Sequence, residues 1–120
     1  MSFVLVALAG AIGAPLRYLV DAWVQRHSSG LPWGTFVINA TGSLLLGLIS
    51  GFALYQGLPD TPKLLIGTGF CGAYTTFSTF TFESVRLAED GSLLEASANV
   101  VGSAVVCLLA AAAGLGLAAV

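Results

Sequence analysis

The chain has 120 residues, of which 57% are hydrophobic and 8% charged, with a formal net charge of −2. A soluble domain carries about 25% charged residues. Four basic and six acidic side chains cannot cover a water-exposed surface of this length, so the sequence predicts a membrane protein. The small net charge and the lack of a basic patch exclude a nucleic-acid partner.

The sequence predicts four membrane-spanning helices, because four segments reach the length of about 20 mostly apolar residues that a crossing requires. They cover about 2–24, 33–55, 64–85 and 96–120. The connections are short and polar, which is typical of antiparallel neighbours. We therefore expect an all-α membrane protein in which residues 1–120 form a single transmembrane domain.

The first span begins without the basic residues of a cleaved signal peptide, so we interpret it as a retained helix. Arg17 and Asp21 lie near its end. A small four-helix multidrug exporter needs a carboxylate embedded in this helix, and Asp21 stands close to the helix end and after Arg17. For Asp21 we favour solvation at the membrane interface or pairing with an arginine.

On the second span, Thr35, Asn39 and Ser43 are spaced four residues apart and share one helical face. An asparagine carboxamide offers two N–H donors and an acceptor, so it can hold an anion without a charge of its own. The alternative is an interhelical hydrogen bond that stabilises the bundle. The second span alone supports both interpretations equally.

The third span is the most informative, because residues 67–82 read GTGFCGAYTTFSTFTF. Unpaired polar groups are costly in lipid, so this concentration of glycine and hydroxyl groups predicts an ion path. Phe77 and Phe80 are three residues apart, and the positive edges of aromatic rings suit a dehydrated anion. Ser78 and Thr79 add hydroxyl donors beside them.

The same stretch predicts a break near the middle of the third helix. Its glycines and the Thr75–Thr76 pair favour an interruption that turns backbone carbonyls inward. Irregular backbone at membrane depth is tolerated where it lines a cavity or binds an ion, as in cation sites lined by carbonyls.

Small residues at four-residue spacing predict close helix packing in lipid. The pairs are Ala9 with Gly13, Gly47 with Gly51, Ala98 with Gly102, and Ala110 with Gly114. They predict a tight bundle, and on their own they also fit a membrane scaffold without transport activity.

The residues that usually carry catalysis are poorly placed for it. No carboxylate occupies the centre of a span, which counts against proton antiport, and for Glu83 we again favour interfacial solvation or pairing with an arginine. His27 stands alone in a polar loop, and one histidine makes neither a metal site nor a catalytic triad. Cys71 and Cys107 are interpreted as small buried hydrophobes. We therefore do not expect an enzyme.

The charge bias that orients a membrane protein is weak here. Lys63 lies on the side of both predicted termini, whereas Arg26 and Arg86 lie on the opposite side and Arg17 lies at a helix end. Orientation follows the excess of lysine and arginine. So small a difference predicts that the chain inserts either way up, which allows antiparallel dimers.

At these residues the sequence resembles the Fluc/CrcB family of small fluoride channels. Gly10–Tyr18 (GAIGAPLRY), Gly34–Gly42 (GTFVINATG) and Gly72–Phe80 (GAYTTFSTF, followed by Glu83) resemble three family motifs in order and spacing. The resemblance spans the whole chain, and the third motif is highly specific. Ala9 departs from the family pattern, in which a second glycine is common.

The resemblance implies a homodimer of four-helix subunits, inserted antiparallel in the cell (inner or plasma) membrane, with fluoride pores along the subunit interface. It implies that fluoride leaves the cytoplasm by passive electrodiffusion, which protects the cell. The implied pore residues are Phe77, Phe80, Asn39, Ser78, Thr79, Thr35 and Ser103.

The resemblance also implies a structural sodium ion at the dimer interface, held by backbone carbonyls of Gly72 and Thr75. Arg17 would attract anions near the vestibule, and Glu83 would lie near a pore end. The implied partners are fluoride, a second copy of the chain and the lipid bilayer. The multidrug exporter and the scaffold remain the alternatives that flux measurements would separate.

Overall fold

The computed structural model describes residues 2–28 and 30–120, which form helices joined by short connections. In chain order these are α1 (Ser2–Arg26), α2 (Trp33–Tyr55), α3 (Asp60–Lys63), the π-helix η1 (Leu64–Cys71), α4 (Gly72–Tyr74), α5 (Ser78–Glu89) and α6 (Leu93–Ala119). α1, α2 and α6 are each long and apolar enough to cross a membrane. The described chain is therefore all-helical, with several helices suited to spanning a bilayer.

Two helices extend beyond the apolar stretches that predicted them. α1 continues to Arg26 rather than ending near residue 24, and α6 begins at Leu93 rather than near residue 96. The end of α1 is held because the Gln25 side-chain oxygen accepts a hydrogen bond from the Gly34 N–H at 2.9 Å. This bond also satisfies a free donor at the start of α2, where Pro32 offers no side-chain cap. Hydropathy therefore marks the apolar crossing rather than the full helix.

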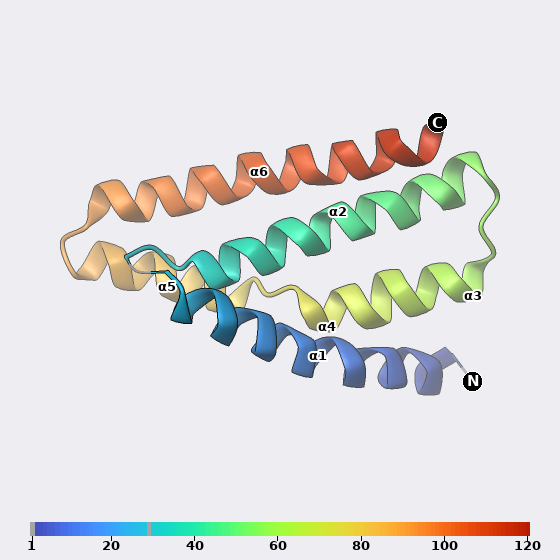
Figure 1. The fold of residues 1–120 in the computed structure, drawn as a ribbon, viewed down its shortest axis with the longest axis horizontal. Coiled ribbons are helices and arrows are strands. Elements are labelled where there is room, and N and C mark those ends of the chain that lie inside the picture. The colour runs from blue at the N-terminus through green and yellow to red at the C-terminus, as the bar shows by residue number, and fades with distance from the viewer. Residues whose placement is uncertain (1, 29) are drawn as a thin grey trace.

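The third apolar stretch is divided into several helical pieces. α3, η1 and α4 follow one another directly from Asp60 to Tyr74, and α5 begins at Ser78. Between them Thr75 is extended, with φ −80° and ψ 160°. Figure 1 shows this piece of irregular chain between α4 and α5.

The interruption between α4 and α5 changes the packing partner of the chain. η1 and α4 contact α1, whereas α5 contacts α6. α2 lies between these groups and packs most extensively on α6, as the parallel course of the two helices in Figure 1 shows. Across the irregular residues the main packing partner of the chain thus changes from α1 to α6.

Small residues account for the closest helix contacts. A Cβ on Gly47 would collide with the Ala111 carbonyl oxygen of α6, and one on Gly13 of α1 would lie 2.6 Å from the Phe70 carbonyl oxygen. The prediction of close packing is thereby confirmed at these glycines. At Gly102 a Cβ would meet no described atom within 4 Å, so the prediction is not tested there within this one chain.

Both chain ends and the connection from α2 to α3 lie at one end of the helices in Figure 1. The connections from α1 to α2 and from α5 to α6 lie at the other end. The exposed residues Lys63 and Arg26 accordingly belong to opposite ends.

Candidate functional site

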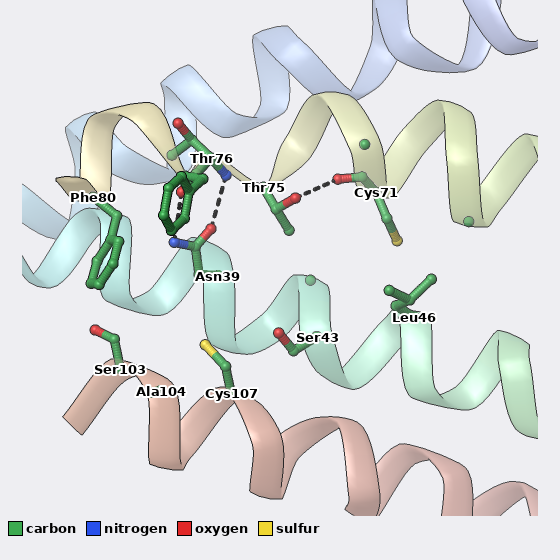
Figure 2. Close-up of a pocket in the computed structure, with 14 residues that line it drawn as sticks. Asn39, Ser43, Leu46, Cys71, Thr75, Thr76, Phe80, Ser103, Ala104 and Cys107 are labelled. Atoms are coloured by element: carbon green, nitrogen blue, oxygen red, sulfur yellow. Dashed lines mark hydrogen bonds between the residues drawn. The ribbon is translucent and has the colours of Figure 1, made fainter. Parts of the chain in front are cut away.

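A cavity of about 450 Å³ opens between α2, α6 and the segment from η1 to α5. Its polar lining residues are Asn39 and Ser43 of α2, Thr75 and Thr76 of the interruption, and Ser103 of α6. The lining also includes Gly72, Phe77 and Phe80 together with the thiols of Cys71 and Cys107. Figure 2 shows the labelled side chains converging on this space from the three segments. The cavity therefore brings together polar groups from the second, third and fourth predicted spans.

Both the nitrogen and the oxygen of the Asn39 carboxamide form hydrogen bonds with the backbone of the interruption. Its Nδ2 donates to the Thr76 carbonyl oxygen at 2.9 Å, and its Oδ1 accepts from the Thr76 N–H at 2.9 Å. The two dashed lines in Figure 2 show this pair. Of the two interpretations of Asn39, the structure shows the interhelical hydrogen bond. One N–H of the carboxamide is left over, because an amide nitrogen carries two donors.

Arg17 supplies a second contact to the interruption. Its Nη1 donates to the Thr75 carbonyl oxygen at 3.5 Å, a long hydrogen bond. The Thr75 hydroxyl and amide both donate to the Cys71 carbonyl oxygen, at 2.9 and 3.0 Å. The backbone groups freed by the break are thus partly satisfied by side chains of α1 and α2, which lipid cannot do.

Phe77 and Phe80 stand next to each other at the edge of the cavity. Their ring centroids are 5.9 Å apart and the ring planes are inclined by 45°. Phe77 is 77% exposed. Phe77 is therefore accessible from outside the chain, whereas Phe80 is half-buried.

Ser103 is the most deeply buried polar group of the cavity, with 5% of its surface exposed. Its Oγ and the Oε1 of Glu83 are buried without a hydrogen-bond partner among the described residues. Figure 2 shows the Ser103 and Phe80 side chains pointing toward the same space. A buried hydroxyl without a partner is costly, which makes Ser103 a candidate binding position.

Three of the residues assigned to the pore by sequence, Ser78, Thr79 and Thr35, lie outside the cavity lining, as do Arg17 and Glu83. Ser78 and Thr79 are exposed at the start of α5. Thr35 is 3% exposed, and its side chain faces the Glu83 carboxyl, which also has Asp21 as a neighbour. Thr35 and Glu83 therefore belong to a separate polar cluster toward one end of the helices.

Asp21 is a structural neighbour of α2 rather than a free intramembrane carboxylate. The Oδ1 of Asp21 lies so close to Gly34 that a Cβ at residue 34 would collide with it. An acidic side chain at a helix N-terminus is favourable because of the helix dipole. This position suits the start of α2.

Sequence reasoning missed the central position of Thr76 and the polar link between α5 and α6. Asn99 Nδ2 donates to Ser84 Oγ at 2.8 Å, and Ser84 Oγ donates to the Phe80 carbonyl oxygen at 2.8 Å. Asn99 and Ser84 are each 7% exposed. A buried asparagine in an apolar helix was the available signal, since buried amides need partners.

Comparison with known proteins places the chain in a family. The model of the CrcB-like protein family, described as camphor resistance (CrcB), matches residues 4–115. A Frankia casuarinae protein named fluoride-specific ion channel FluC 1 is 51% identical, over 98% of this chain and 96% of its own length. A Streptomyces avermitilis protein of the same name is 48% identical, over 96% of this chain and 94% of its own.

A more distant relative shows the same correspondence over nearly the whole chain. The fluoride-specific ion channel FluC of Syntrophotalea carbinolica is 43% identical, over 98% of both chains. The family match covers residues 4–115, and the three relatives are 43–51% identical over nearly the whole of both chains. This chain belongs to the CrcB-like protein family.

Proposed function

We propose that this protein is a fluoride-selective ion channel that releases cytoplasmic fluoride by passive electrodiffusion. The single observation that carries the proposal is the grouping of Phe77, Phe80, Asn39 and Ser103 around one cavity within the apolar helices. The names of the relatives, each a fluoride-specific ion channel, support the same ion.

The chemistry of this lining suits a small anion. Ring edges carry partial positive charge, the spare Asn39 N–H is a donor, and the Ser103 hydroxyl lacks a described partner. Such donors replace part of the hydration shell that fluoride loses on entering a narrow path. The lining includes no carboxylate that would repel the ion.

Conduction needs no coupled energy source. Hydrogen fluoride enters a cell as a neutral weak acid and dissociates there, and an interior-negative potential drives the anion out. The driving force is about 2.3 kcal/mol per charge per 100 mV. Release by this route protects the cell from fluoride that it has accumulated.

We propose that the working channel is an antiparallel homodimer in the cell membrane. Three observations support it. The cavity is not enclosed by this chain, and Phe77 is largely exposed. In addition, helical Gly72 and Gly102 have no described neighbour that requires a glycine. A glycine inside a helix costs about 1 kcal/mol relative to alanine. A second copy packed on this face would account for that cost and complete the pore.

A structural sodium ion fits this arrangement only with two copies. Gly72 and Thr75 line the same cavity, and carbonyl oxygens are suitable ligands for a hard cation. One chain offers two such carbonyls, and the Thr75 oxygen already accepts from Arg17. The same pair from a second copy would raise the number of carbonyls to a set that can hold the ion. The bound ion would supply positive charge between the two interruptions.

The remaining assigned residues take supporting roles in this proposal. Arg17 attracts anions near the entrance, and the cluster of Thr35 and Glu83 lies near a pore end. Ser78 and Thr79 are exposed beside Phe77 and extend the path of hydroxyl donors beyond the cavity. The lipid bilayer surrounds the proposed dimer.

Efflux from liposomes tests the proposal. Purified protein should release fluoride rapidly once a potassium ionophore balances charge, with little release of chloride. Phe80→Ile should lower fluoride efflux at least about tenfold, which corresponds to about 1.4 kcal/mol in the barrier, and Asn39→Asp should lower it as well. Phe82→Ile is the matched control, because Phe82 is on the same helix, 62% exposed, and outside the cavity.

Three outcomes would count against the proposal. They are the absence of fluoride efflux from the wild-type protein, equal efflux from the Phe80→Ile and wild-type proteins, and proton-driven export of organic cations. The last result would identify an exporter, and silence in every assay would identify a scaffold.

A further inference from the structure

We propose that Thr76 is a positioning residue of the ion path, acting through its backbone and its hydroxyl to fix Phe77, Phe80 and the neighbouring hydroxyl donors. The proposal rests on the proposed fluoride conduction. Thr76 is 9% exposed, and two independent sets of hydrogen bonds meet at this one residue.

The first set fixes the backbone of Thr76. Its N–H and its carbonyl oxygen both pair with the Asn39 carboxamide, each at 2.9 Å. Two bonds to one planar amide determine both the position and the rotation of that peptide segment. The irregular chain between α4 and α5 is therefore fastened to α2 at a single residue, one position before Phe77.

The second set starts α5. Thr76 Oγ1 accepts from the Thr79 N–H at 3.2 Å. A threonine oxygen that accepts from the amide three residues later is the usual helix N-cap bond. Phe77, the residue directly before α5, makes no side-chain cap. The direction in which α5 leaves the break, and with it the position of Phe80, is thus set by the Thr76 hydroxyl.

The same hydroxyl organises the donors around it. Thr76 Oγ1 donates to Thr79 Oγ1 at 3.2 Å and lies 3.3 Å from Ser78 Oγ. Three hydroxyl groups carry three hydrogens, and the two contacts among them use two. One hydroxyl hydrogen is left to point away from the cluster. Because Thr76 gives its hydrogen to Thr79, the Thr79 hydroxyl keeps its own hydrogen for an anion.

Two substitutions distinguish the contribution of the Thr76 hydroxyl from the contribution of its side-chain shape. Thr76→Val has nearly the same shape but lacks the oxygen, and Thr76→Ser keeps the oxygen and loses the methyl group. In liposomes, Thr76→Val should lower fluoride efflux about tenfold, since an N-cap and its network are lost together. Thr76→Ser should stay within about threefold of wild type. Thr68→Val, an exposed position in η1, is the control and should conduct like wild type.

A second readout distinguishes positioning from general stability. If Thr76 aligns donors, Thr76→Val should also raise chloride efflux relative to fluoride efflux, which a merely less stable channel would not do. Amide hydrogen exchange of the wild-type protein supplies a test that needs no variant. The Thr76 and Thr79 amides should exchange slowly, and the Phe77 amide between them faster.

The possible outcomes distinguish a failure of this inference from a failure of the proposed function. A wild-type protein without fluoride efflux overturns the channel itself. A conducting wild type with unchanged efflux and selectivity in Thr76→Val overturns only the role of Thr76, as does a Thr76→Ser protein that is as impaired as Thr76→Val. If Thr76→Val does not fold, rapid exchange of the wild-type Thr79 amide still contradicts the proposal.

Discussion

Ser103 is a residue at which stability and the proposed function can be tested separately. Its hydroxyl is buried at the cavity between α2, α5 and α6, and no described group accepts or donates a hydrogen bond to it. A buried hydroxyl left unsatisfied costs about 1–3 kcal/mol. A residue retained for packing alone would be alanine, which fills nearly the same space without that cost.

Ser103→Ala should therefore leave thermal stability unchanged or raise it, while lowering fluoride efflux severalfold. The removal of an unpaired oxygen relieves a desolvation cost, and the removal of a donor weakens the replacement of water around the ion. Thermal unfolding in detergent and liposome efflux measure the two effects on one preparation. Ser50→Ala, an exposed position on α2, is the control. A destabilised Ser103→Ala protein with normal efflux would show that the hydroxyl is structural.

The buried pair of Asn99 and Ser84 makes a different prediction, because here both groups are satisfied. Ser84→Ala should be more destabilising than Asn99→Leu, since it leaves the Asn99 carboxamide buried without its acceptor, at a cost of about 1–3 kcal/mol. In Asn99→Leu the Ser84 hydroxyl still has the Phe80 carbonyl oxygen. The double variant should be more stable than Ser84→Ala alone. Thermal unfolding of all four proteins completes the cycle, and strictly additive effects would contradict the pairing.

At the scale of elements, α2 is the helix on which the others are placed. α6 packs along it at Gly47, Gly51 and Gly114, and the interruption before α5 is fastened to it through Asn39. In lipid, helices gain little from apolar burial against one another, so close backbone approach carries much of the attraction. The closely packed pair of α2 and α6 therefore forms the fixed part of the cavity lining.

Two glycines of α6, only two residues apart, test this account. A Cβ on Gly114 would collide with the Leu44 carbonyl oxygen and lie 2.7 Å from the Leu48 nitrogen, whereas one on Gly116 would meet no described atom within 4 Å. Gly114→Ala should destabilise the protein by about 1–3 kcal/mol through overpacking. Gly116→Ala should be neutral or stabilising by up to about 1 kcal/mol, from its helix propensity. Thermal unfolding measures both, and equal effects would mean that α6 does not approach α2 as closely as described.

The elements also show what sequence can predict for this chain. The prediction of an all-α membrane protein with several spanning helices is confirmed, because length, hydropathy and the low charge are local properties of the chain. The partners of Asn39 were beyond the same reasoning. Four-residue spacing places Asn39 on a helix face, but it does not show that an interrupted backbone 37 residues later will present an N–H and a carbonyl to it. For the same reason the sequence indicates a helix break at Thr76 but does not predict that its hydroxyl accepts from the Thr79 N–H at the start of α5.

At the scale of the whole molecule, the distribution of charge is the property that matters most for assembly. Lys63 lies at the end that holds both chain termini, and Arg26 and Arg86 lie at the opposite end, all three exposed. Orientation in the membrane follows the side with more lysine and arginine. So small a difference predicts insertion in either orientation, and the antiparallel pair that we propose requires both orientations.

Two oppositely biased variants turn this property into a test. Asp60→Lys with Arg26→Gln and Arg86→Gln places the basic excess at the end with the termini, and Lys63→Gln with Asp90→Lys places it at the other end; all these positions are exposed. Each variant alone should insert in one orientation and lose fluoride efflux, because no antiparallel partner is present. Co-expression of the two should restore efflux. A tag at the C-terminus, probed from each side of the membrane, verifies the orientation. Normal efflux from either variant alone, once its single orientation is verified, would show that the working channel does not need two opposed subunits.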